Sequence, residues 1–67
     1  MSNPRFDENI LQTIHSLEFA YEHLMDASGS SNAVESLLLM DVIELVVRAK
    51  QRTEAIQSAV ACSEEGN

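Results

Sequence analysis

Cysteine, glycine and proline are scarce in this chain of 67 residues, and tryptophan is absent. The single cysteine, Cys62, excludes an internal disulfide framework. With only Gly29 and Gly66, the sequence has no glycine-rich loop that could cradle a phosphate. A chain of about 60 residues buries only about 60% of its unfolded surface on folding, so small proteins without disulfides usually rely on a metal or on association.

Positive charge is also scarce: four Lys and Arg stand against eleven Asp and Glu, which gives a net charge of −7. Nucleic acids and anionic membranes attract clustered positive charge, so neither is an expected partner. The acidic balance favours solubility and suits docking on a basic surface of another protein.

No targeting or membrane-spanning segment is visible in the sequence. The N-terminal residues lack the apolar region of a secretory signal. The longest apolar run is about half of the roughly 20 residues that cross a bilayer. Together with the absence of a disulfide framework, this predicts a cytoplasmic protein.

The first half of the chain has the pattern of an amphipathic helix. Asn3 suits an N-cap, and Pro4 suits the first helical position. Apolar residues then recur at steps of three and four, at Phe6, Ile10, Ile14, Leu17, Tyr21 and Leu24. The pattern predicts a helix over about residues 4–26.

Residues 27–32 form the only break in the helical pattern. Gly29 is expected to adopt the left-handed conformation that ends many helices. Asn32 and Glu35 have the spacing of a capping box, which predicts a second helix over about residues 33–61 and a disordered tail over 63–67. A connection this short makes the two helices lie side by side and antiparallel.

The second helix has more apolar surface than one neighbouring helix can cover. One apolar stripe contains Val34, Leu38, Val42, Leu45, Ala49, Ile56 and Val60. An adjacent stripe contains Leu39, Ile43, Val46 or Val47, and Lys50. We expect the first stripe to pack on the first helix and the second to remain uncovered.

The end of the second helix should also extend beyond the first helix, where it either frays or lies on a partner. The predicted interface, with a twin chain or with another protein, therefore combines the uncovered stripe with this end. It consists of Leu39, Ile43, Val46, Val47, Ile56 and Val60.

The sequence offers no convincing catalytic or metal-binding pattern. Cys62 could act as a nucleophile with His15 or His23, but it lies near a terminus where nothing would hold the geometry. The two histidines are eight residues apart, about 12 Å along a helix, and cannot share one ion. We expect neither an enzyme nor a metal or cofactor site.

Two arginines allow a further interpretation. Arg48 and Arg52 share a helix face and, doubled in an oligomer, could bind a phosphate or a small nucleotide. The simpler interpretation is structural, because Glu44 precedes Arg48 by four residues, the favourable spacing and order for an ion pair within a helix.

The layout resembles the Rop-type RNA-binding dimers, in which helical hairpins pair into four-helix bundles. The likeness covers the architecture of most of the chain and no sequence motif. Those proteins present basic residues of the first helix to RNA, whereas the first helix here has only Arg5 as a basic residue. Its acidic residues are Asp7, Glu8, Glu18, Glu22 and Asp26. The resemblance therefore implies the bundle architecture and not RNA binding.

These observations predict an all-α fold, an antiparallel two-helix hairpin that dimerises into a four-helix bundle. The expected function is that of a small acidic protein-binding regulator, such as an adaptor, anti-activator or inhibitor, acting as a homodimer. Two alternatives stay open. One is an oligomer that binds or sequesters a small molecule or nucleotide between protomers, and the other is a purely structural assembly element.

Overall fold

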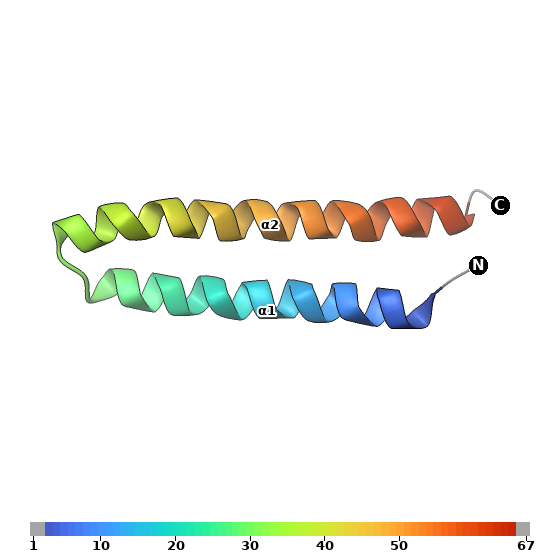
Figure 1. The fold of residues 1–67 in the computed structure, drawn as a ribbon, viewed down its shortest axis with the longest axis horizontal. Helices are drawn as coiled ribbons and strands as arrows, with labels where there is room; N and C mark the ends of the chain where they lie inside the picture. The colour runs from blue at the N-terminus through green and yellow to red at the C-terminus, as the bar shows by residue number, and fades with distance from the viewer. Residues whose placement is uncertain (1–2, 66–67) are drawn as a thin grey trace.

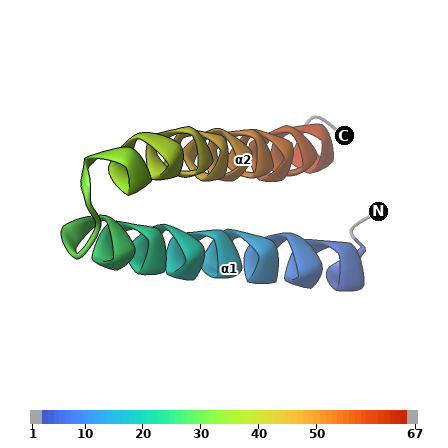
Figure 2. The same cartoon turned by 60° about the vertical axis from the view of Figure 1, so that its left-hand side comes forward.

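The computed structural model describes residues 3–65, and within this range the chain forms two helices and no strand. Helix α1 (Pro4–Gly29) and helix α2 (Ala33–Glu65) lie side by side and antiparallel (Figure 1). The turned view in Figure 2 shows the same single hairpin, which measures 52 × 16 × 11 Å. The prediction of an all-α helical hairpin is confirmed.

Helix α1 begins as the sequence predicts. The Asn3 side chain accepts a hydrogen bond of 3.2 Å from the backbone N–H of Phe6. The Asn3 carbonyl accepts the first helical bond, 3.0 Å from the N–H of Asp7. Pro4 follows at the start of the helix, where its missing N–H removes no bond.

The end of α1 differs from the prediction. The helix continues through Gly29, and none of residues 3–65, glycine included, has a positive φ, so the expected left-handed Gly29 is wrong. The helix instead tightens at its end: the N–H of Ser30 bonds the Ala27 carbonyl at 3.2 Å, and the N–H of Ser31 bonds the Ser28 carbonyl at 3.3 Å. The loop therefore covers only residues 30–32 rather than 27–32.

A capping box starts α2, as predicted. The N–H of Glu35 donates to Asn32 Oδ1 at 2.8 Å, and the N–H of Asn32 donates to Glu35 Oε1 at 3.0 Å. These two bonds satisfy donors that the first turn of a helix leaves unpaired. The cap fixes where the chain re-enters helical structure after the loop.

We expect Asn32→Ala to lower the free energy of unfolding by about 1 kcal/mol, because it removes the side-chain acceptor of this cap. Urea denaturation followed by circular dichroism measures the loss. Asn9→Ala is the matched control, since Asn9 is exposed within α1 and its side chain caps no helix end. Equal stability of the two variants would contradict a stabilising cap at Asn32.

Helix α2 is longer than predicted. It continues to Glu65 rather than ending near residue 61. The predicted disordered tail is therefore wrong for residues 63–65, while residues 66–67 lie outside the described part of the chain. The C-terminal turns contain Ala59 and Ala61, residues with high helix propensity, and no glycine or proline before Gly66.

The two helices contact each other through rows spaced three and four residues apart. Ile14 is the one fully buried side chain among those described, with 6% of its surface exposed. Around it the contact row of α1 is partly buried, at Ile10, Leu17, Ala20, Leu24 and Ser28. The partly buried side chains of α2 are Ser36, Leu39, Ile43, Val46, Val47, Ala49, Lys50, Thr53 and Val60. This is the spacing of a coiled-coil seam. Because almost all of these contact residues are only partly buried, the hairpin has almost no interior.

A hydrogen bond at the loop joins Ser31 to Ser36 in the first turn of α2. The hydroxyls of Ser31 and Ser36 lie 2.6 Å apart, and both residues are partly buried. The Ser31 hydroxyl also bonds the Ser28 carbonyl at 2.8 Å. Because Ser36 is held toward the end of α1, the residues three, seven and ten positions later turn toward α1 as well.

Candidate functional site

The structure reverses the predicted roles of the two apolar stripes of α2. The stripe expected to be uncovered, Leu39, Ile43, Val46 and Val47, is partly buried. Since α1 is the only other element among residues 3–65, this burial comes from the contact with α1. The stripe expected to pack on α1 is largely exposed, with Leu38 67% and Leu45 63% exposed. The predicted division of α2 is therefore wrong.

Two members of the predicted interface lie apart from that stripe. Val60 is partly buried and borders a hollow with Phe6 and Ile10 of α1. Ile56 is 46% exposed and is the one predicted interface residue that stands clear of the helix contact. Whether any of these side chains meets another chain stays a prediction, because a partly buried residue can still be covered further.

The exposed residues of this stripe, together with the partly buried Ala49, form a second row with coiled-coil spacing, here called the seam face. It consists of Leu38, Val42, Leu45, Ala49 and Ile56. These residues follow each other at steps of four, three, four and seven, and lie about 100° around α2 from the row that contacts α1. Arg52 occupies the position in the row between Ala49 and Ile56, and Glu35 occupies the position before Leu38. The seam face thus has an apolar centre with an acid near one end and a base near the other.

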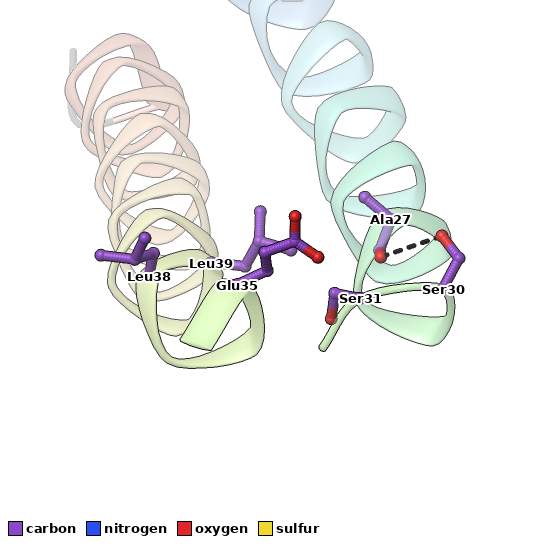
Figure 3. A pocket seen from close by; sticks show the side chains of 6 residues that line it. All are labelled: Ala27, Ser30, Ser31, Glu35, Leu38 and Leu39. Atoms are coloured by element: carbon purple, nitrogen blue, oxygen red, sulfur yellow. Dashed lines mark hydrogen bonds between the residues drawn. The ribbon is translucent and has the colours of Figure 1, made fainter. Parts of the chain in front are cut away.

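A wide, open hollow of about 460 Å³ lies at the loop end of the seam face (Figure 3). It is lined by Ala27, Ser30, Ser31, Glu35, Leu38 and Leu39. Figure 3 shows Leu39 and Glu35 on the side of α2 that is turned toward α1, with Leu38 pointing away from α1. The hollow therefore connects the end of α1 with the start of the seam face.

A second exposed apolar group lies on the other side of the hairpin, and we call it the methionine face. It consists of Met25, 46% exposed, Leu37, 68% exposed, and Met40, 62% exposed. In the sequence Met25 directly follows Leu24, and Met40 directly follows Leu39; both leucines belong to the rows through which the helices contact each other. Because the helices are antiparallel, the two methionines lie on the same side of this contact. The acids Glu18 and Glu22 share this side of α1.

The arginine pair proposed for an anionic ligand is partly neutralised. Arg48 bonds Glu44 at 3.1 Å, and the two side chains are 63% and 61% exposed. This confirms the predicted ion pair within α2, which contributes little stability at such exposure. Asp41 and Leu45 border the same shallow hollow as this pair. Two carboxylates beside Arg48 weaken the attraction of this surface for a phosphate, and the Arg52 side chain is exposed.

The remaining polar residues form no reactive cluster in the described part of the chain. His15, Glu18 and Glu22 line a shallow groove along α1 together with Phe19. No group of three possible metal ligands occurs within residues 3–65. Cys62 is an exposed free thiol near the end of α2. Neither described helix is both long and apolar enough to cross a membrane.

The accessible surface is large for the mass of the chain. The hairpin exposes 5343 Å² for 7.4 kDa, whereas a compact monomer of this mass exposes about 4,200 Å². The excess is about 1,100 Å² per chain on the same scaling. Stable protein interfaces cover about 800 Å² on each partner, so the excess is large enough for one side of such an interface.

Comparison with protein-family models, curated proteins and solved structures found no match to this chain.

Proposed function

We propose that this protein is a small acidic protein-binding regulator that acts as a homodimer of helical hairpins. The observation that carries the proposal is the near absence of an interior: one described side chain is buried, while twelve large apolar side chains are exposed. Isolated exposed apolar residues are ordinary, but rows of them at helical spacing mark interaction surfaces. Self-association covers one face, and a target protein covers another.

The methionine face is the surface we assign to the target. Met25 and Met40 have flexible, polarizable side chains that adapt to different partners. Glu18 and Glu22 add negative charge beside them, which favours a target segment that combines apolar residues with Lys or Arg. The net charge of −7 per chain supports the same choice of a basic target.

The alternative, a small-molecule or nucleotide binder, has less support. The 460 Å³ hollow has the volume of a ligand pocket, but it is open and its lining includes the Glu35 carboxylate. Within one chain, Arg48 is the nearer arginine and lies nine residues beyond Leu39, about 13 Å along α2. A saturable, salt-sensitive rise in melting temperature with nucleotides would favour this alternative.

The test of the regulator is affinity capture from a lysate of the source, comparing the native chain with Met40→Glu. Met40 is exposed and outside the seam face, so the variant should keep its mass and its helicity in solution. We expect at least one protein to be retained by the native chain and lost with Met40→Glu.

Ser58→Glu serves as the control, because Ser58 lies in an exposed position on α2 far from Met25 and Met40. It should retain the same protein as the native chain. Capture of the same set of proteins by all three chains, or of none, would contradict a target site at the methionine face.

A further inference from the structure

We propose that the seam face binds α2 of a second copy of this chain, antiparallel and about a two-fold axis, in one defined register. The inference rests on the proposed homodimer and adds the face and the alignment that form it. In this register Val42 lies opposite Leu45 of the other copy, and Leu38 lies opposite Ala49. Two-fold symmetry makes each of these contacts occur twice.

The area and shape of the surface suit a second copy. The excess accessible surface of about 1,100 Å² per chain matches one side of a stable dimer interface. Along the seam a large residue meets a small one at Leu38 and Ala49, which lets the helices approach closely. Beyond this pair, Ile56 of the second copy lies just past the start of α2, at the loop end of the hairpin, where Ala27, Ser31 and Leu39 line the 460 Å³ hollow. The hollow at the loop thus receives an apolar side chain of the other copy.

The charges at the ends of the seam are complementary in this register. Glu35 lies opposite Arg52 of the second copy, and both side chains are exposed in the single chain. The Glu35 carboxylate uses Oε1 for the capping box and keeps Oε2 for the arginine. Glu35 and Arg52 are the only two charged residues in this row of α2 from residue 35 to residue 56, and the pairing gives each of them a partner of opposite charge.

Two charged residues beside the seam face favour this register over registers that are shifted by one heptad. Asp41 and Arg48 flank the apolar residues on the solvent side. In the proposed register Asp41 lies diagonally across the seam from Arg48 of the second copy, two residues from the directly opposite position, and both copies gain this pair. A shift of one heptad in one direction brings Arg48 opposite Arg48, and a shift in the other direction brings Asp41 opposite Asp41. Either shift replaces attraction by repulsion across the two-fold axis.

Disulfide trapping tests the register directly. In a chain carrying Cys62→Ser, the pair Leu38→Cys and Ala49→Cys should form a covalent dimer on mild oxidation, seen on a non-reducing gel. The two positions are eleven residues apart in one helix, about 16 Å, so the bond cannot form within a chain. Leu38→Cys with Ile56→Cys is the control for a one-heptad shift and should stay monomeric on the gel.

Charge exchange gives a second, independent measurement. Asp41→Arg should weaken the dimer ~10-fold in Kd, because it places like charges opposite each other twice. The double variant Asp41→Arg with Arg48→Asp should restore the native Kd to within ~3-fold. Asp26→Arg makes the same change of net charge on α1 and should not weaken the dimer.

The outcomes separate this inference from the proposed homodimer. A chain that is dimeric by mass but is trapped by the Leu38 and Ile56 pair, or is indifferent to Asp41→Arg, overturns the register alone. A chain that stays monomeric at all concentrations overturns both. Trapping by the Leu38 and Ala49 pair, together with rescue by the charge exchange, supports the proposed alignment.

Discussion

Leu45→Asp should convert the dimer into a monomer that is largely unfolded at room temperature. Leu45 is 63% exposed in the single hairpin, so the substitution alone would cost a monomer little. In the proposed dimer Leu45 lies near the two-fold axis, where two unpaired carboxylates would be removed from water. We expect a loss of at least 3 kcal/mol of dimer stability, measured as the shift of the urea midpoint and of the sedimenting mass.

Phe19→Asp provides a closely matched control. Phe19 is 64% exposed, carries a large apolar side chain and lies within α1 away from the seam face. The same substitution there should leave mass and melting temperature nearly unchanged. If Leu45→Asp and Phe19→Asp behave alike, the exposure of Leu45 reflects an ordinary solvent-facing residue and the seam face is not an interface.

Ile14→Ala should give the largest loss from a substitution that removes only methyl and methylene groups. Ile14 is the one fully buried side chain of the described hairpin, at 6% exposure. Truncating a buried isoleucine costs 2–5 kcal/mol, roughly the lost transfer energy plus a cavity. A small protein has about that much total stability, so we expect the variant to lose its cooperative thermal transition.

Leu11→Ala is the comparison for this prediction. Leu11 is 45% exposed one turn earlier on α1, so truncation there should cost less than about 1 kcal/mol. Circular dichroism at increasing temperature distinguishes the two variants. Similar melting curves for both would show that Ile14 does not anchor the helix contact.

Local structure could be predicted from the sequence because short-range chemistry decides it. The two helix starts could be predicted from residue type and spacing alone, in Asn3 with Pro4 and in Asn32 with Glu35. The structure has both caps. The same holds for the Glu44 and Arg48 pair, because an offset of four residues places two side chains on one face of a helix. The hairpin itself follows from a break too short for any other arrangement.

The rotation of α2 could not be predicted from apolar content. The row that contacts α1 contains Ser36, Lys50 and Thr53, so it is less apolar than the seam face. The apolar pattern therefore favours the richer stripe for the contact with α1, which the structure shows to be wrong. In the structure the Ser31 and Ser36 hydroxyls lie 2.6 Å apart across the loop, and Ser36 belongs to the partly buried row that contacts α1. A partly buried lysine is compatible with that row because its aliphatic stem can cover apolar surface while its amine remains near water.

The end of α1 could not be predicted from the sequence pattern for a related reason. Gly29 and the serines after it have low helix propensity, but hydrogen bonds to the carbonyls of Ala27 and Ser28 let α1 continue to Gly29. The methionine face was missed because Met25 and Met40 belong to different helices. Only the antiparallel arrangement places them on one side of the hairpin.

Sedimentation equilibrium of the native chain at several concentrations is the decisive test of the proposed dimer. We expect a species of twice the 7.4 kDa chain mass that dissociates on dilution, with a melting temperature that rises with protein concentration. A compact 7.4 kDa monomer that melts cooperatively at the same temperature at every concentration would contradict it.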